Sequence, residues 1–347
     1  MAILHVMTGD EVGMTFDVII GNPPYQSNTG GGSNIELKVP LYQKFIEFGM
    51  DMHPKKLVML IPSRWINGGK GLDDFRTKLI LSKRIKSIHS FEDSSNIFDG
   101  VLIGGGVQYI DIDNDMHSFV HIYNMDGDER YKYDYRPLNE FNITDMHGKC
   151  QYTVLIDNHA ANIARKVIDK TFDYMGDYVL QVSPFRLDSK FKDSEVYSDK
   201  TPIKVIESNG KYTYTSEYNI TQNNEHIHKY KVITGKVNPG IRSLNGSQVI
   251  NKPRIIYPGE VCNLSYLVIG SFDTELEALN CLKYYKTKFV RFLILITQSG
   301  MNMTARNYAF VPRLVFDTQY TDNSLYSMYN LSEDDINYIE KRVRQME

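Results

Sequence analysis

The sequence predicts an α/β protein, with a doubly wound sheet in its first domain and a mixed α+β second domain. Two observations lead to this prediction. Up to about residue 150, apolar runs of strand length alternate with amphipathic segments of helix length, and the connections between them are short. Beyond that point the chain is rich in tyrosine and turn residues before two well-marked helices. We therefore expect a first domain over residues 1–150 and a second over residues 151–347.

Five apolar runs in the first domain predict strands. They cover residues 16–21, 56–62, 85–91, 104–113 and 118–123. Apolar residues at helical spacing predict helices over residues 39–52 and 73–81, between the first three strands. Strand–helix–strand units of this kind form parallel sheets, whose functional residues lie at the carboxyl ends of the strands. The active edge is therefore expected just after residues 21 and 62.

Helix signals define the second domain. Residues 159–170 have helical character, and irregular β structure is expected from there to about residue 254. Thr274 and Glu277 form a capping-box pattern ahead of one long helix that reaches about residue 297. Ser332 and Asp335 repeat this pattern ahead of a C-terminal helix.

Charge is unevenly distributed along the chain. The whole sequence has 39 Lys and Arg residues against 42 Asp and Glu residues, a net charge of −3. Residues 226–313 hold 12 Lys and Arg against 4 Asp and Glu, a local balance of +8. A basic block within a mildly acidic chain is typical of one surface that binds a polyanion.

The cysteines and the hydrophobic pattern indicate the cellular compartment of the protein. Cys150, Cys262 and Cys281 are odd in number and lack metal-ligand spacing. This argues against a disulfide framework and a zinc site, and it favours the reducing cytoplasm. The first residues lack a basic segment followed by an apolar stretch, and no apolar run is long enough to span a bilayer. We expect a cytoplasmic protein without a bound metal.

The most specific pattern is Asn22-Pro23-Pro24-Tyr25, directly after the first predicted strand. It suits chemistry on an amino group conjugated to an aromatic ring, whose lone pair is delocalised. The Asn22 carboxamide oxygen and the main-chain carbonyl of Pro23 can accept both N–H groups and restore that lone pair, and the prolines keep the acceptors rigid. Tyr25 offers a ring on which an extruded base can stack. The alternative interpretation is a plain turn after a strand.

These residues resemble the adenine-N6 DNA methyltransferases of restriction–modification systems, of the type with a C-terminal target-recognition domain (TaqI-like in layout). Residues 16–25 are similar to the catalytic motif and its strand, and residues 96–109 to the segment that supplies the second aromatic wall of the base pocket. The resemblance implies a Rossmann-like methyltransferase sheet, S-adenosylmethionine as methyl donor and double-stranded DNA as substrate. It places Phe98 opposite Tyr25, with Tyr109 as second choice, and it assigns Asp10 and Asn22 to the cofactor.

The glycine-rich loop of this family, which cradles the methionine part of the cofactor, has no counterpart in the sequence. The glycines at 104–106 precede a β-type run, whereas the family's loop precedes a helix. We therefore expect a fragment, half of a split enzyme or a degenerate product, with weak binding of S-adenosylmethionine by this chain alone. Its expected partners include an N-terminal methyltransferase segment or a restriction subunit.

The basic block supplies the candidates for DNA contact. Lysine and arginine fix phosphates, and arginine also reads base edges. The selected residues are Lys231, Lys236, Arg242, Lys252, Arg254 and Arg306. Two other functions stay open: a DNA-recognition module without methyltransferase activity, and a protein-glutamine methyltransferase, for which the same tetrapeptide acts on a side-chain amide. The long basic region argues against the latter, since a small amide substrate requires no DNA-sized surface.

Overall fold

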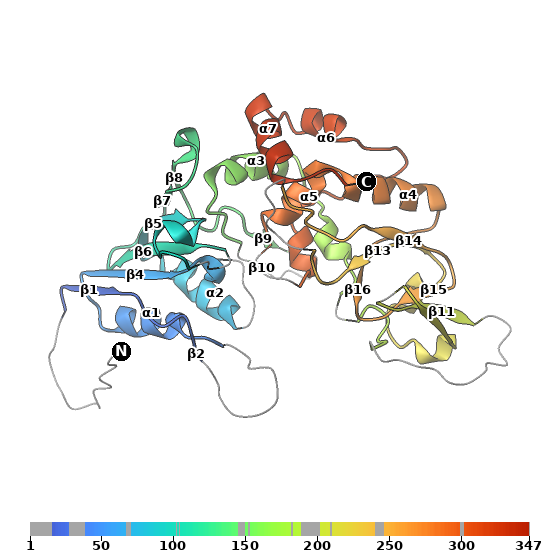
Figure 1. Ribbon diagram of the computed structural model, residues 1–347, viewed down its shortest axis with the longest axis horizontal. Helices are drawn as coiled ribbons and strands as arrows, with labels where there is room; N and C mark the ends of the chain where they lie inside the picture. The colour runs from blue at the N-terminus through green and yellow to red at the C-terminus, as the bar shows by residue number, and fades with distance from the viewer. Residues whose placement is uncertain are drawn as a thin grey trace. The chain divides into compact units, whose positions relative to one another are not determined.

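The protein is described by a computed structural model (Figure 1). It describes residues 16–27, 39–66, 71–101, 103, 105–144, 150–151, 153–181, 183–188, 202–208, 210–239, 246–298 and 302–346. The chain divides into two compact units. One holds the described residues up to Thr144 together with Cys150–Ala161, and the other holds those from Asn162 onward.

The first unit is built on a six-stranded sheet with the order β1-β4-β6-β5-β7-β8. Its strands are β1 (Val18–Gly21), β4 (Lys56–Pro62), β5 (Ile85–Phe91), β6 (Val107–Asp113), β7 (Val120–Asn124) and β8 (Tyr133–Arg136). The first five confirm the strands predicted from the sequence. The last is an additional edge strand, and its Tyr-Asp-Tyr-Arg sequence is too short and polar to stand out as one.

The sheet is mixed. β1 pairs with β4 and β5 pairs with β7 in parallel, whereas β6 runs antiparallel to both β4 and β5. The chain turns into β6 at Gly105 and Gly106, whose φ angles are +91° and +82°. A Cβ on Gly106 would lie 2.1 Å from the carbonyl oxygen of Phe91, so glycine is required there.

Two helices, α1 (Tyr42–Asp51) and α2 (Leu72–Ser82), confirm the helices predicted between the first three strands. Both pack on the same face of the sheet, because Ile46 of α1 and Phe75 of α2 belong to one hydrophobic core with the inward side chains of β4 to β7. The α/β prediction is therefore confirmed. A doubly wound sheet carries helices on both faces. The prediction of this arrangement is not met by α1 and α2, since both cover the same face.

The opposite face of the sheet carries polar, aromatic and exposed apolar side chains. On β1, Val18 and Ile20 are 51% and 76% exposed. β1 is also an edge strand of the described sheet, with β4 as its neighbour. An apolar edge strand left open in this way is a template for pairing with another segment.

Shorter elements complete this unit. They are β2 (Gln26–Ser27), β3 (Val39–Pro40), β9 (Ile143–Thr144), β10 (Cys150–Gln151) and the 3₁₀ helices η1 (Ser63–Trp65), η2 (Ser94–Asn96) and η3 (Glu129–Tyr131). β2 and β3 pair antiparallel just after the Asn22–Tyr25 segment. Helix α3 (Asn158–Ile168), which the sequence predicts over 159–170, begins in the first unit and continues into the second.

The second unit contains two three-stranded sheets, ordered β12-β11-β15 and β14-β13-β16. Their strands are β11 (Ile203–Ile206), β12 (Tyr212–Thr215), β13 (Tyr230–Gly235), β14 (Arg254–Ile256), β15 (Glu260–Cys262) and β16 (Tyr266–Phe272). Both sheets contribute to one hydrophobic core. The 3₁₀ helices of this unit are η4 (Met175–Tyr178), η5 (Glu217–Asn219), η6 (Asn224–His226) and η7 (Ala305–Tyr308).

The prediction of one continuous helix up to about residue 297 is wrong, because the chain forms two helices there. The chain forms α4 (Glu275–Lys286) and α5 (Lys288–Leu295), and Thr287 between them is extended, with φ −63° and ψ 149°. Its hydroxyl accepts the Val290 N–H at 3.3 Å, so a new helix cap ends the predicted continuity. The two caps predicted at Thr274 and Ser332 are both present.

The C-terminal helices are α6 (Asp322–Met328) and α7 (Glu333–Arg342). Among the described helices, none is both long enough and apolar enough to cross a membrane.

Candidate functional site

The predicted catalytic residues follow β1 at the edge where β1 and β4 end. The two strands are parallel and in register, with Gly21 opposite Met59, so their carboxyl ends lie side by side. Residues 22–25 continue from β1, and η1 continues from β4. Functional residues of parallel strands gather at such an edge.

Asn22 is exposed and Pro23 is buried. Within the described part of the chain, the Asn22 carboxamide has no hydrogen-bond partner. The backbone beyond it is held in place, because the Leu41 N–H donates to the Tyr25 carbonyl oxygen at 3.2 Å and Gln26 pairs with Pro40. An uncommitted amide on a fixed backbone is suited to accept hydrogen bonds from a ligand without reorganisation.

Tyr25 is partly buried beside the sheet. Its hydroxyl is buried and, within the described residues, has no hydrogen-bond partner. Burial, and to a smaller extent the nearby Tyr109 hydroxyl, raise the pKa of Tyr25 to about 12, so its ring stays neutral. Tyr109 on β6 also packs edge-on against Phe91, with ring centroids 6.0 Å apart.

Among the described aromatic residues, Tyr109 is the one whose hydroxyl contributes to the raised pKa of Tyr25. Phe98, predicted to lie opposite Tyr25, is partly buried in the loop after η2, where its backbone N–H donates to the Ser94 carbonyl oxygen at 2.9 Å. Among the described residues, no ring contact joins Phe98 and Tyr25. Asp10, predicted to bind the cofactor, lies outside the described residues.

Several buried polar atoms around this edge have no partner among the described residues. They are Tyr25 Oη, Tyr42 Oη, Gln43 Oε1, Ser63 Oγ and Arg64 Nε. Burial raises the pKa of Tyr42, and the positive charge of Arg64 partly offsets this rise. The two side chains therefore lie near each other. Unsatisfied buried groups are uncommon in folded proteins, so these atoms are candidates for hydrogen bonds with water, an ion or a polar ligand.

Trp65 anchors this segment to the core. It is fully buried, its indole N–H donates to Gln108 Oε1 at 2.9 Å, and its carbonyl oxygen accepts from Arg76 Nε at 2.7 Å. The bend after β4, which carries Ser63 and Arg64, is therefore held by side chains of α2 and β6. Trp65 itself has a structural role.

A shallow hollow of about 290 Å³ lies on the open face of the sheet. Its lining residues are Lys56, Val58, Ser87, His89, Tyr109 and Asp111. Lys56 Nζ lies 3.1 Å from Asp111 Oδ2, whereas Asp111 Oδ1 is buried without a partner among the described residues. Burial lowers the pKa of His89, whose ring stacks on Tyr123 at 4.4 Å. Tyr109 thus borders both this hollow and Tyr25.

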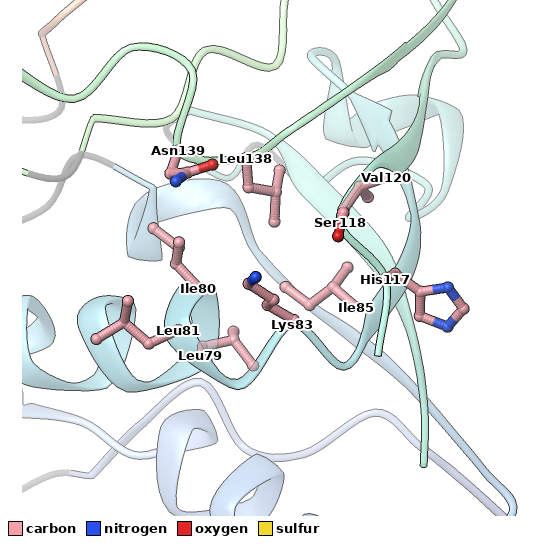
Figure 2. Close-up of a pocket in the computed structure, with 10 residues that line it drawn as sticks. All are labelled: Leu79, Ile80, Leu81, Lys83, Ile85, His117, Ser118, Val120, Leu138 and Asn139. Atoms are coloured by element: carbon pink, nitrogen blue, oxygen red, sulfur yellow. The ribbon is translucent and has the colours of Figure 1, made fainter. Parts of the chain in front are cut away.

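A second cavity, of only about 40 Å³, lies between the end of α2 and the start of β5 and β7. Figure 2 shows its lining, with Leu79 and Ile80 on the helix, Ile85 and Val120 from the strands, and Leu138 beyond them. It has room for water but not for a base or cofactor, so it is not a candidate site.

In the second unit, the position of Lys231 contradicts its prediction as a DNA contact. Its side chain is fully buried, and Nζ donates to the carbonyl oxygens of His226, Ile227 and Lys229 at 2.9, 2.8 and 2.5 Å. Burial lowers the pKa of Lys231 to about 8. Because this ammonium group already binds carbonyls at the end of η6, Lys231 is not available for contact with DNA.

The other predicted DNA contacts differ in accessibility. Lys252 and Arg254 are exposed, Lys236 and Arg306 are partly buried, and Arg242 lies outside the described residues. Arg254 is held by an aromatic partner that sequence reasoning missed, namely Tyr266: Nη2 donates to Tyr266 Oη at 3.0 Å.

Sequence reasoning also missed an aromatic surface formed by Tyr212 and Tyr214 on β12. Lys204 on β11 lies over the Tyr212 ring at 4.8 Å and pairs with Glu260 at 2.8 Å, and Tyr214 is exposed beside Tyr212. The Tyr-Thr-Tyr-Thr alternation of residues 212–215 is the signal that marks this strand, since its tyrosines share one face.

Comparison with known proteins gives matches to the N-terminal part of the chain. Residues 2–98 match the family model described as Eco57I restriction-modification methylase. A protein of Mycoplasma pneumoniae described as an uncharacterized adenine-specific methylase is 41% identical over 97 residues, which is 28% of this chain and 23% of that protein. The N-terminal part of this chain is thus similar to restriction–modification methylases, and the chain spans about a quarter of the length of the relative that it matches.

Solved structures give weaker likenesses. The Type IIL restriction-modification enzyme MmeI in complex with DNA aligns over 94% of this chain and 56% of its own, with 9% identity and a TM-score of 0.35. The type IIG restriction endonuclease BpuSI aligns over 94% of this chain and 49% of its own, with 9% identity and a TM-score of 0.34. At these scores the likenesses support no conclusion about this chain.

Proposed function

We propose that this chain is the catalytic and target-recognition part of an adenine-N6 DNA methyltransferase of a restriction–modification system. The observation that carries the proposal is the placement of the Asn22–Tyr25 segment at the carboxyl edge of β1, beside buried polar atoms without partners. The N-terminal match to restriction–modification methylases supports it.

The proposed chemistry uses Asn22 and Pro23 as acceptors. The Asn22 carboxamide oxygen and the Pro23 carbonyl oxygen take the two N–H groups of a flipped adenine, and the nitrogen lone pair becomes available for in-line attack on a methyl group. Pro24 keeps the segment rigid. Tyr25 stacks on the base, with Tyr109 or Phe98 as the opposite wall, and the high pKa of Tyr25 keeps its face uncharged.

S-adenosylmethionine is the proposed methyl donor, and its sulfonium supplies an activated methyl group. The unpartnered hydroxyls of Tyr42 and Ser63 and the Arg64 guanidinium fit a ligand that carries both acceptors and donors. Asp10 remains the proposed contact of the cofactor adenine, together with Asn22.

The edge of β1 that no described strand covers supports a partner that completes the first unit. The exposed apolar side chains of Val18 and Ile20 would be covered if another strand and its helix packed on this edge. An N-terminal methyltransferase segment or a restriction subunit is the proposed partner, and double-stranded DNA is the proposed substrate of the second unit.

The test is methylation of duplex DNA by the chain combined with the segment that completes its sheet. Asn22→Ala should reduce the rate by about 10² to 10³, because one preorganised acceptor of the reacting amine is lost. Affinity for the duplex should change little, since the proposed phosphate and groove contacts are made by the second unit. Equal methylation by Asn22→Ala and wild type would refute the assignment.

A second candidate is a DNA-recognition module without methyl transfer. It is favoured by the exposed Lys252 and Arg254, which lie in the second unit and do not depend on the first. Duplex binding without methylation in any combination with a completing segment would make this candidate the better one.

A further inference from the structure

Arg254 stands out among the cations of the second unit, because its guanidinium is oriented but not neutralised. It is exposed on β14, Nη2 donates to Tyr266 Oη at 3.0 Å, and Cζ lies 5.2 Å from the centre of the Tyr266 ring. Tyr266 is itself fixed, since its hydroxyl donates to the Glu207 carbonyl oxygen at 3.0 Å. The single phenolic proton is thereby used, which leaves the oxygen lone pairs to accept from Arg254.

The other cations near Arg254 in the second unit are either paired, buried or not held in one orientation. The ammonium of Lys204 is paired with Glu260 at 2.8 Å, and that of Lys231 is buried among carbonyls. Lys252 is exposed two residues before Arg254, and no described aromatic ring supports its ammonium group. Arg254 has no carboxylate partner among the described residues. Of the five N–H donors of a guanidinium, one is used for orientation and the others remain for a ligand.

An oriented guanidinium fork suits a planar acceptor pair. In the major groove, guanine presents O6 and N7 side by side, and arginine binds both at once. A phosphate can also accept from an arginine fork, but it does not require a fixed plane, since lysine binds it as a point charge. Fixing the arginine before binding reduces the conformational entropy lost in the complex.

We infer that Arg254 reads a guanine in the DNA target, whereas Lys252 contacts the phosphate backbone. Tyr266 is a positioning residue, which sets the plane of the guanidinium. This inference rests on the proposed DNA-binding function and adds to it that the recognised sequence contains a guanine read from the major groove.

The experiment uses the full 347-residue chain and duplexes selected by it from a randomised pool. Each guanine of the selected site is then replaced by 7-deazaguanine, which removes the N7 acceptor but keeps base pairing and the minor groove. At one position the wild type should lose about 10-fold to 100-fold in affinity. Arg254→Ala should bind the two duplexes equally, and Arg254→Lys should discriminate poorly although it keeps the charge.

Two matched variants separate the roles. Tyr266→Phe keeps the ring but removes the hydroxyl, so discrimination should fall while the salt dependence of binding stays the same. Lys252→Ala should weaken binding to both duplexes alike and reduce the salt slope by about 1.

The inference is overturned if Arg254→Ala weakens binding to every duplex equally and keeps the wild-type preference for guanine over 7-deazaguanine. It is likewise overturned, with DNA binding still established, if the wild type binds duplexes without any such preference. If the folded wild type binds no duplex at any salt concentration, both this inference and the proposed DNA-binding function fail. Circular dichroism of each variant confirms that the fold is retained.

Discussion

The Asn22–Tyr25 segment and the basic block over residues 226–313 are both prominent in the sequence, yet the structure uses their polar groups in opposite ways. Around the first, buried hydroxyl, amide and guanidinium atoms have no partner among the described residues. In the second, Lys231 and Lys229 are engaged within the protein, the former with carbonyl oxygens and the latter with Asp273. A short motif at a strand end thus marks groups available to a ligand, whereas a local charge excess also counts cations that stabilise the fold.

The largest expected effect concerns salt. Binding of a duplex by the full chain should weaken on the order of 10³-fold between low and moderate salt if several phosphates are contacted. Fluorescence anisotropy over a salt series measures the slope. Lys252→Ala should make it shallower, and Asn22→Ala, in the other region, should leave it unchanged. Identical slopes for wild type and Lys252→Ala would remove this residue from the contact surface.

The next largest expected effect is the loss of stability when Lys231 is replaced. In Lys231→Met, four carbonyl oxygens lose their buried donor, and the free energy of unfolding should fall by roughly 2 to 4 kcal/mol. Lys252→Met, at an exposed position, should change it by less than about 0.5 kcal/mol. Urea denaturation measures both. Similar stability of the two variants would show that Lys231 does not hold these carbonyls.

Lys231 should also make stability depend on pH. Its folded pKa, about 8, lies below the ordinary 10.5, so between these values the unfolded chain binds more protons. The unfolding free energy therefore rises with pH across this window, by roughly 2 kcal/mol at pH 10 relative to pH 7. The difference between wild type and Lys231→Met isolates this contribution, because the tyrosines are common to both. A flat difference would contradict the lowered pKa.

The smallest expected effect is at Tyr25. Tyr25→Phe removes a buried hydroxyl that has no partner in the described structure, so stability should stay the same or increase by about 1 kcal/mol. Tyr214→Phe, at an exposed hydroxyl, is the matched control and should change little. Thermal unfolding of the isolated chain suffices. Clear destabilisation by Tyr25→Phe would mean that the hydroxyl has a partner in the free protein.

Local patterns predicted the elements of the first unit well, because each strand and helix carries its own apolar period. They did not predict that β6 is antiparallel, since strand order depends on pairing partners far apart in the chain. The break at Thr287 was missed because the helical pattern continues through it, and only the cap shows the interruption. The burial of Lys231 could not be predicted from the sequence either, since four carbonyl oxygens converge on it only in the fold. The roles of Asn22, Tyr25 and Phe98 remain predictions.

The position of β6 has a consequence for folding. β4 and β5 share no hydrogen bonds with each other, because β6, which comes later in the chain, lies between them. The centre of the sheet therefore closes only after residues 107–113 are available, and this contact requires a loop of considerable sequence separation. The segment that matches the methylase family ends at residue 98. That boundary divides a cooperative unit, so residues 2–98 alone are not expected to form an autonomous domain.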